Sequence, residues 1–456
     1  MLLALGLLAA SAAADERADL RGELEALRDA NGVAGFGLVL VDLEAVDQVL
    51  VGGLADWNSA RPVERNDYVR IGSITKAFTG LGFIAAEREG TVDLDAPIAP
   101  DLAPNLFDNR WHPDRPVTLA MLLEHTAGLR DMAKAEWDFN DPVSLTEALA
   151  VEPSSRVLAW PPGIQSVYSN SGAGVAAHVF EVQSGEDFEA WVESTVFEPL
   201  GMGSATFRRT DEVTAGLMTG YDTDGRTPIK YWHQLYRPFG SINVRLPEIG
   251  RFVRMLLGRG TLDGQAIFSE AEIERMERPT TTAAARAGLT FGYGLGNYAR
   301  INERLVWHGH GGDADGYLSH FGYSPTLGKG YFLVINAFQN RTLRAMRGKV
   351  EAYLAGDSSE NFEAPRPRPA AELAALAGTY HRTAARFGPA NGSVEVTFED
   401  GRLRLVRGNR SEVLLPLPSG HFRRSFEPIA TTTFARVGNR IYLQGSFGDF
   451  ERQGHR

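Results

Sequence analysis

Ser73 and Lys76 are the residues of this sequence whose types and spacing best suit covalent catalysis. The apolar residues Phe78, Leu81 and Ile84 follow at helical spacing, which predicts a helix with Ser73 in its first turn and Lys76 on the same side. A serine hydroxyl is a poor nucleophile near neutral pH, but a nearby amine can accept its proton if burial lowers the pKa of the amine. The start of the helix adds a positive dipole and free N–H groups for an oxyanion. We therefore expect a serine nucleophile with a lysine base.

Tyr168 and Asn170 form a second pair. Two residues apart in an extended segment, their side chains project to the same side. A phenol beside the amine can pass a proton to a leaving group, and an Asn amide can hold both Lys76 and a substrate carbonyl. The alternative is an ordinary loop tyrosine followed by an asparagine that caps a helix over residues 171–180.

A glycine-rich histidine motif at residues 307–312 precedes two strand-like runs. Its glycines let a substrate lie along the strand, while the N–H of Asp313 joins that of Ser73 to bind an oxyanion. The substrate-binding candidates are therefore His310, Gly311, Gly312 and Asp313. The H-x-G pattern recurs at residues 320–322, but glycines flank His310 and a strand follows it, so His310 is the better candidate.

Two other interpretations of these residues stay open. The first is a metal site, because His308 and His310 share one face of a strand and Asp313 and Asp315 lie nearby. The second is a non-catalytic binding protein or sensor, whose pocket is occupied or acylated without turnover.

Each of the three patterns is a weak signal by itself. For a chain of this composition, however, the expected number of chance co-occurrences of all three in this order is only about 0.02. The motifs Ser73-Ile74-Thr75-Lys76, His125-Thr126-Ala127-Gly128-Leu129, Tyr168-Ser169-Asn170 and Gly309-His310-Gly311-Gly312 resemble those of the penicillin-recognising serine hydrolases. The resemblance is to the branch of class C β-lactamases, D-alanyl-D-alanine carboxypeptidases, D-aminopeptidases and related esterases. It covers roughly residues 15–355 and implies an α/β fold, in which helices flank an antiparallel sheet and an all-helical region forms the other wall of the cleft.

The resemblance also implies a role for each residue. Ser73 is the nucleophile that becomes acylated, Lys76 its base, Tyr168 the proton relay and Asn170 a substrate holder, while His310 takes the position of the third motif. The histidine motif at 125–129 is a structural turn. The implied function is hydrolysis of an ester, an amide or a D-amino-acid-containing peptide through an acyl-enzyme, without a metal or cofactor. A true β-lactamase or a D-alanyl-D-alanine carboxypeptidase is the alternative.

The third motif departs from that of class C β-lactamases, which carry a Lys and a hydroxyl residue where this chain has His310 and Gly311. Asp313 and Asp315 add negative charge nearby, and like charges repel at close range. We therefore expect a substrate with a free carboxylate to be disfavoured relative to a neutral or cationic one.

Strand-like and helical runs alternate in a way that predicts one sheet built from both ends of the main domain. A helix over Leu20 to Leu27 leads into a buried strand at 36–41, and a hairpin at 317–323 and 331–335 leads into a helix at 341–354. The segment from about 73 to 290 is mostly helical and belongs between them.

Residues 1–14 form an apolar run that ends in Ala12-Ala13-Ala14, as in a signal peptide, although the run lacks basic residues. A buried N-terminal helix is the alternative. We expect the catalytic domain at 15–356 to follow, working in the periplasm or outside the cell. A proline-rich linker at 357–369 precedes an all-β domain at 370–456, where residues 394–405 alternate about an Asp400-Gly401 turn. This domain resembles a lipocalin-like barrel.

The composition limits the partners of the chain. Its 456 residues are 43% hydrophobic, carry a net charge of −11 and include no cysteine. Such a charge repels nucleic acids and anionic membranes, and the lack of cysteine excludes disulfides and thiolate chemistry. No segment after the first residues is apolar enough for a membrane span. We expect a small-molecule or short-peptide substrate; the oligomeric state does not follow from the sequence.

Overall fold

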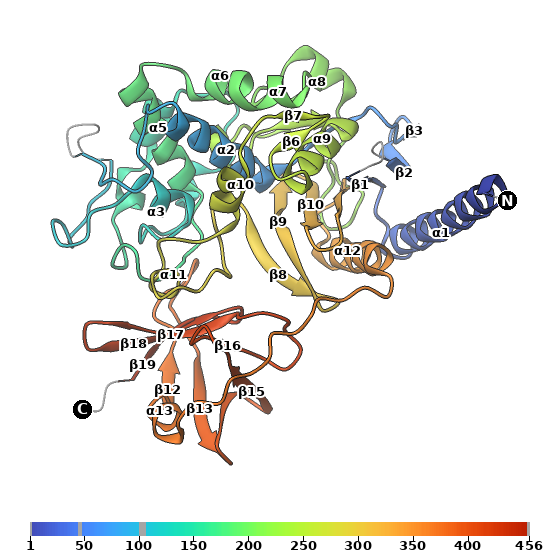
Figure 1. Cartoon of the computed structure of the whole chain (residues 1–456). Coiled ribbons are helices and arrows are strands. Elements are labelled where there is room, and N and C mark those ends of the chain that lie inside the picture. The colour runs from blue at the N-terminus through green and yellow to red at the C-terminus, as the bar shows by residue number, and fades with distance from the viewer. Residues whose placement is uncertain (1, 44–47, 100–105, 454–456) are drawn as a thin grey trace.

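The computed structural model describes residues 2–43, 48–99 and 106–453, and places most of them in two parts (Figure 1). The larger part is built on a seven-stranded antiparallel sheet with the strand order β3-β2-β1-β11-β10-β9-β8. Its strands are β1 (Gly35–Asp42), β2 (Gln48–Asp56), β3 (Arg61–Pro62), β8 (Tyr298–Asn302), β9 (Leu305–Ala314), β10 (Tyr317–Ser324) and β11 (Lys329–Ile335). Since β1 pairs with β11, the prediction of one sheet made from both ends of this part is confirmed.

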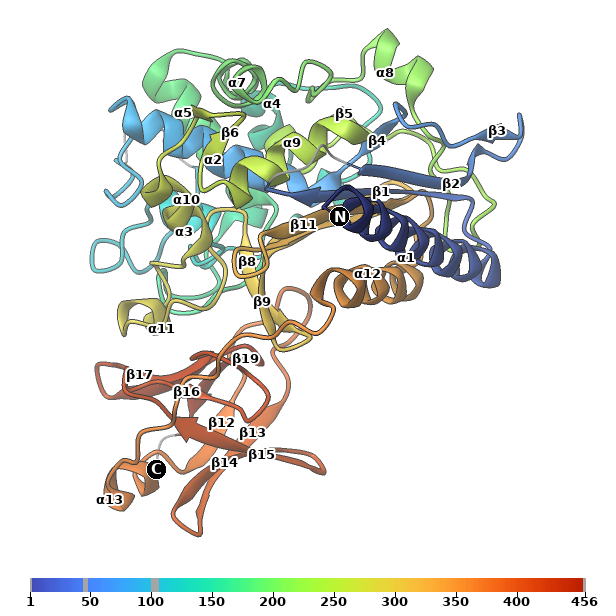
Figure 2. The same ribbon diagram turned by 45° about the vertical axis from the view of Figure 1, so that its right-hand side comes forward.

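Alternation along β1 assigns its side chains to two separate cores. Phe36 and Leu38 face α1 (Leu2–Asn31) and α12 (Asn340–Ala355), which lie side by side on one face of the sheet (Figure 2). Val39 faces the opposite core, where α9 (Leu246–Leu257) covers the sheet. Both faces are therefore buried, which explains why this strand is a continuous apolar run.

The helical region lies beyond α9 and is centred on α2 (Thr75–Arg88), whose residues are buried from Thr75 to Ala86. Its longest neighbour is α5 (Ser171–Ser184). The shorter elements are α3 (Leu119–Leu123), α4 (Leu145–Val151), α6 (Phe188–Val192), α7 (Glu198–Leu200), α8 (Asp211–Gly216), α10 (Glu270–Glu277), α11 (Ala283–Arg286), β4 (Tyr68–Arg70), β5 (Asn243–Arg245), β6 (Thr261–Leu262) and β7 (Gln265–Ala266). A mostly helical middle was expected, and it is present.

The smaller part is a closed antiparallel barrel that follows α13 (Ala370–Ala374). Its strands are β12 (Gly378–His381), β13 (Ser393–Glu399), β14 (Arg402–Arg407), β15 (Arg410–Pro416), β16 (Phe422–Arg423), β17 (Thr432–Val437), β18 (Arg440–Gly445) and β19 (Gly448–Arg452). Asp400 and Gly401 both have positive φ between β13 and β14, as a tight hairpin turn requires, so the predicted hairpin is confirmed. Apolar side chains such as Val396, Leu405 and Leu443 fill the interior.

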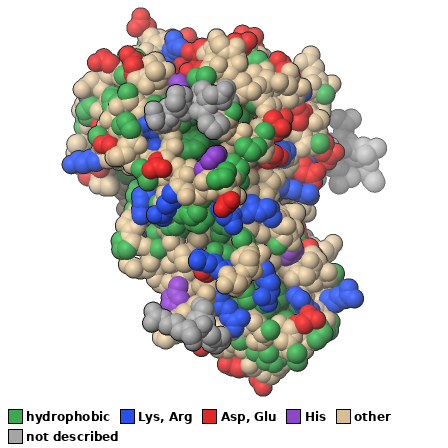
Figure 3. Space-filling view, turned by 90° about the vertical axis from the view of Figure 1, so that its left-hand side faces the viewer, with side chains coloured by type: hydrophobic (Ala, Val, Ile, Leu, Met, Phe, Trp, Pro, Cys, Tyr) green, Lys and Arg blue, Asp and Glu red, His purple; other side chains and the backbone are tan. Residues whose placement is uncertain are grey.

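The barrel docks on the larger part through hydrogen bonds to its loops. Trp160 donates its indole N–H to the carbonyl of Thr383 at 2.9 Å, and Asp449 accepts the backbone N–H of Ser166 at 2.9 Å. In the space-filling view, Lys and Arg side chains gather at the waist between the two parts (Figure 3).

Two expectations about the chain ends are not tested. The side chains of residues 1–16, which include the whole predicted leader at 1–14, lie outside the described residues, although the helix α1 itself extends back to Leu2. The boundaries of the linker at 357–369 also stay a prediction. Among the helices that the structure describes, none combines the length and apolar character needed to cross a membrane.

Candidate active site

Ser73 lies in a 3-10 turn, Gly72–Ile74, that leads directly into α2. The sequence placed Ser73 inside the first α-helical turn, but the regular helix begins two residues later, at Thr75. The reason is Gly72, whose φ of +52° is left-handed and whose Cβ, if it had one, would lie 2.5 Å from the backbone nitrogen of Asp313. The tight turn therefore presses the backbone at Ser73 against β9.

Lys76 is buried, and its amine makes three polar contacts. It donates to the side-chain oxygen of Asn170 at 2.8 Å and to the carbonyl of Phe239 at 2.9 Å, and it lies 3.2 Å from the hydroxyl oxygen of Ser73. The amide and carbonyl oxygens can only accept, so they take both N–H groups of a neutral amine. Its lone pair is then directed at the hydroxyl of Ser73.

Burial favours that neutral amine. It is the main reason why the pKa of Lys76 is lowered well below its usual value, while the carboxylate of Asp131 opposes the effect. The geometry and the direction of this pKa shift together suit a base beside a serine hydroxyl.

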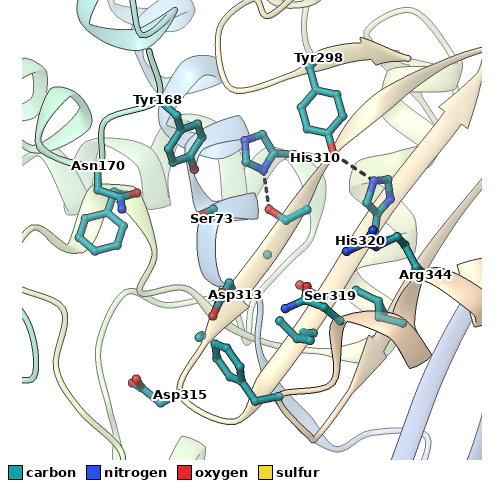
Figure 4. Close-up of a pocket in the computed structure, with 18 of the residues that line it drawn as sticks. Ser73, Tyr168, Asn170, Tyr298, His310, Asp313, Asp315, Ser319, His320 and Arg344 are labelled. Atoms are coloured by element: carbon teal, nitrogen blue, oxygen red, sulfur yellow. Dashed lines mark hydrogen bonds between the residues drawn. The ribbon is translucent and has the colours of Figure 1, made fainter. Parts of the chain in front are cut away.

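Tyr168 lies over the same amine, which is 4.8 Å from the centre of its ring, and its hydroxyl is directed at Ser73 (Figure 4). Burial raises the pKa of Tyr168, and its hydrogen bond with Ser73 opposes that shift. The phenol therefore stays protonated near neutral pH, which suits a proton relay and not a phenolate base.

Asn170 immediately precedes α5, but its side chain does not cap that helix. It accepts from Lys76 and donates to Asp131 at 3.3 Å, while its backbone N–H donates to the same carboxylate at 2.8 Å. The alternative of a simple capping asparagine is wrong. Asp131 instead holds Asn170 from both its backbone and its side chain.

His310 forms a wall of the site from β9 and is neutral. Its Nδ1 contacts the carbonyl of Gly311 at 2.5 Å, so Nδ1 carries the proton, and Nε2 accepts from the hydroxyl of Tyr293 at 2.8 Å. Burial, with a contribution from Lys76, lowers the pKa of His310 to about 3. The third motif therefore supplies no cation.

Glycine is needed in β9 because the strand runs against the turn that holds Ser73. A Cβ on Gly312 would lie 1.9 Å from the carbonyl oxygen of Ile71. Neighbouring β8 pairs with β9 only as far as Gly309, which leaves the edge from His310 to Ala314 to line the pocket. An extended substrate can add to such an edge.

The pocket has a volume of about 740 Å³ and opens from Ser73 towards α12. Its apolar walls include Trp137 and Phe239, and its basic residues are Arg344, Arg347 and Arg386. A pocket of this size can hold a small molecule or a short peptide beside Ser73.

The comparison with known proteins follows this geometry. Residues 20–356 match the family model described as Beta-lactamase. The chain belongs to the beta-lactamase family. Penicillin-binding protein 4 of Amycolatopsis lactamdurans is 25% identical over 389 residues, covering 80% of this chain and 98% of that protein. The human beta-lactamase-like 1 is 26% identical over 330 residues, covering 67% of this chain but only 62% of its own length.

Among solved structures, the crystal structure of SurE aligns over 97% of this chain and 100% of its own, with a TM-score of 0.63 and 21% identity. This likeness supports the fold, barrel included. In this member of the beta-lactamase family, Ser73, Lys76 and Tyr168 lie together in the pocket.

One premise of the electrostatic expectation is wrong. Asp315 does not present a free charge to the pocket, because it forms a 2.5 Å ion pair with Arg70, a side chain that is only 1% exposed. Burial and the charge of Asp315 raise the pKa of Asp313 to about 6. Asp313 is still mostly ionised at pH 7, and of the three arginines in the lining Arg386 is paired with Asp131 and Arg347 lies 3.6 Å from Glu351. The preference against a carboxylate substrate therefore stays a prediction.

The proposed metal ligands do not converge either. Asp315 is held by Arg70, and both ring nitrogens of His310 have protein partners. Over the described part of the chain, no three His, Asp or Glu side chains are placed to hold a metal ion. The competing histidine, His320, is buried between Tyr298 and Tyr331 and is not bonded to the nucleophile.

Sequence reasoning missed three residues of the site. Tyr293 bonds His310, Asp131 holds Asn170, and Arg386 reaches the pocket from the barrel. Asp131 follows the motif at 125–129 closely enough to be suspected, but nothing local marks Arg386, since its partner Asp131 is 255 positions away.

Proposed function

We propose that this protein is a serine hydrolase that cleaves an ester, an amide or a D-amino-acid-containing peptide through an acyl-enzyme on Ser73. One observation carries the proposal. Two acceptor oxygens occupy the N–H groups of Lys76, so the neutral amine has its lone pair free for the hydroxyl of Ser73.

The steps follow from the positions of the atoms. As the oxygen of Ser73 bonds to the substrate carbonyl carbon, its proton moves to Lys76, and the carbonyl oxygen becomes an oxyanion between the N–H groups of Ser73 and Asp313. The bond to the leaving group then breaks, and the proton of Lys76 passes through the hydroxyl of Tyr168 to the leaving atom. Water repeats the sequence on the acyl group and releases the acid.

A second candidate is a true β-lactamase or a D-alanyl-D-alanine carboxypeptidase, whose substrates carry a carboxylate. Arg344 favours it, because it lines the pocket on the side of α12 and can attract an anion, whereas Arg347 beside it lies 3.6 Å from the carboxylate of Glu351. The name of penicillin-binding protein 4, with which the chain aligns over most of its length, is in keeping with such a substrate.

The nucleophile is tested by reaction with a fluorophosphonate probe and by mapping the label. We expect one label, on Ser73, and none in Ser73→Ala. Labelling elsewhere, or none at all, contradicts the proposal. Turnover of nitrocefin, a p-nitrophenyl ester and a D-amino-acid amide by the unlabelled wild-type protein then decides between the two candidates, and an acyl-enzyme that persists for hours points to a sensor.

We also propose that residues 1–14 are a leader and that the enzyme works in the periplasm or outside the cell. The support is the apolar run itself and its small residues at 12–14. N-terminal sequencing of the exported protein is expected to begin after Ala14; recovery of the intact N-terminus from the cytoplasm contradicts this.

A further inference from the structure

Arg386 belongs to the barrel but acts inside the pocket of the other part. It lies between β12 and β13 and lines the pocket together with Ser73. Its guanidinium group holds one oxygen of Asp131, with Nη2 at 2.6 Å and Nε at 2.7 Å. It also lies 4.6 Å from the centre of the Tyr168 ring.

Asp131 gives this contact its importance. Its side chain is only 1% exposed, against 40% for that of Arg386, and a buried carboxylate is costly without a compensating charge. Its other bonds come from the N–H groups of Met132 and Asn170, which are neutral. Among the described residues, Arg386 is the one cation within ion-pair distance of Asp131.

From Asp131 a continuous chain of bonds leads to the base. Asp131 accepts the backbone and side-chain N–H groups of Asn170, and Asn170 accepts from Lys76. A shift of the carboxylate therefore moves the amide that orients the amine. The barrel thus touches the base through two intermediates, without contacting it directly.

We propose that Arg386 is a positioning residue of the acyl-transfer site, by which the barrel holds Asp131, and through it Asn170 and Lys76, in the reactive arrangement. This inference rests on the function proposed above. It makes the barrel part of the active site and not an appended module.

The charges around Lys76 set the direction of the effect. The titratable and charged side chains that face it are Ser73, His125, Asp131, Tyr168, His310 and Arg386. Burial lowers the pKa of Lys76, the Asp131 carboxylate raises it, and the Arg386 guanidinium lowers it again. Without Arg386, the carboxylate is uncompensated and the amine holds its proton more tightly.

The test measures the rate at which a fluorophosphonate labels Ser73 in the full-length chain as a function of pH. In Arg386→Ala we expect the midpoint of the rise in rate to move up by about one pH unit, with labelling at pH 7 about tenfold slower. Arg386→Lys keeps the charge but not the two-bond geometry, so it recovers only part of the loss. The double variant Arg386→Ala/Asp131→Asn lacks both charges and is expected to have a midpoint near that of the wild type.

Arg382 provides the matched control, because it lies on the same connection of the barrel but packs near Phe450 and has no contact with Asp131. Arg382→Ala is expected to label like the wild type. Equal losses in the two alanine variants, or an unchanged midpoint in Arg386→Ala, overturn the proposal.

A second measurement separates this proposal from the proposed function. Hydrogen exchange at the backbone N–H of Asn170, which is bonded to Asp131 at 2.8 Å, is expected to become faster in Arg386→Ala and not in Arg382→Ala. Unchanged exchange contradicts the positioning role. If the wild type is not labelled on Ser73, the proposed function fails, and the exchange experiment still decides whether Arg386 holds this segment.

Discussion

Competition for the amine of Lys76 is the central feature at the scale of single residues. The side-chain oxygen of Asn170 and the carbonyl oxygen of Phe239 accept hydrogen bonds from this amine, and burial lowers its pKa well below the usual value. The pKa of Tyr168 is shifted in the opposite direction: burial raises it, because burial favours the protonated phenol. An amine that gives up its proton easily and a phenol that keeps it are suited to pass one proton in turn.

Lys76→Met is predicted to separate activity from stability. The folded pKa of Lys76 is below its unfolded value, so its burial costs stability at pH values below the folded pKa, and this cost fades as the pH rises towards the unfolded value. Removing the amine slows labelling of Ser73 by about 10²- to 10⁴-fold. The stability of Lys76→Met relative to the wild type is expected to fall as the pH rises, because the wild type then loses the cost of burying a charged amine. Labelling rates and thermal melts from pH 6 to 9 check both parts; a difference in melting temperature that does not change with pH contradicts the charge argument.

Local spacing was enough to pair these residues, because side chains two or three positions apart are close in the chain, although the backbone at Asn170 is helical and not extended as expected. Ser73 with Lys76 and Tyr168 with Asn170 are pairs of this kind. The ion pairs that neutralise buried or pocket-lining carboxylates were not predictable from local spacing. Asp315 is paired with Arg70, 245 positions earlier, and no spacing rule links such residues.

At the scale of elements, the site depends on the close packing of β9 against the turn that carries Ser73, in which the two backbones are in direct contact. Gly72 and Gly312 are the two positions where the approach leaves no room for a side chain. Across the same contact, Ser319 of β10 donates its hydroxyl to the carbonyl of Ile71 at 3.2 Å. Strand and turn are thus fixed to each other, and with them the backbone N–H groups of Ser73 and Asp313.

Gly312→Ala is predicted to damage both fold and activity, because its Cβ would lie 1.9 Å from the carbonyl oxygen of Ile71 and 2.3 Å from the hydroxyl of Ser319. The added methyl group must push β9 away from the turn at Ile71, which is expected to lower the free energy of unfolding by about 3 kcal/mol. Gly311→Ala is the control for stability, since its Cβ would have no neighbour closer than 3.7 Å. Urea unfolding of both variants checks this; equal stabilities contradict the close-approach argument.

Helices and strands with a clear hydrophobic periodicity were predictable from the sequence, but the long-range contacts between them were not. The strand at 36–41, the hairpin at 317–335 and the barrel hairpin around Asp400-Gly401 are where the alternation placed them. The 3-10 turn at 72–74 was missed, because its cause is the packing of Gly72 on a strand from the other end of the domain. Strand order likewise depends on long-range pairing.

At the scale of the whole molecule, the barrel is attached by buried polar contacts to backbone groups of the larger part. The clearest is Gln444 of β18, which is 1% exposed. It accepts the backbone N–H of Ala284 at 2.7 Å and donates to the carbonyl of Ile164 at 2.9 Å. Such a two-way bond fixes orientation as well as distance, and the orientation of the barrel is what directs Arg386 into the pocket.

Gln444→Ala is therefore predicted to weaken docking and catalysis together. The change leaves the N–H of Ala284 and the carbonyl of Ile164 buried without partners, which is expected to destabilise the protein by about 1–3 kcal/mol. Because the barrel then holds Arg386 less firmly, labelling of Ser73 slows in the same variant. The control is Gln453→Ala, whose side chain is exposed and bonds only His381 within the barrel. Thermal melts and labelling rates of both variants test the coupling: a destabilised Gln444→Ala protein that labels at the wild-type rate shows that the barrel adds stability without shaping the site.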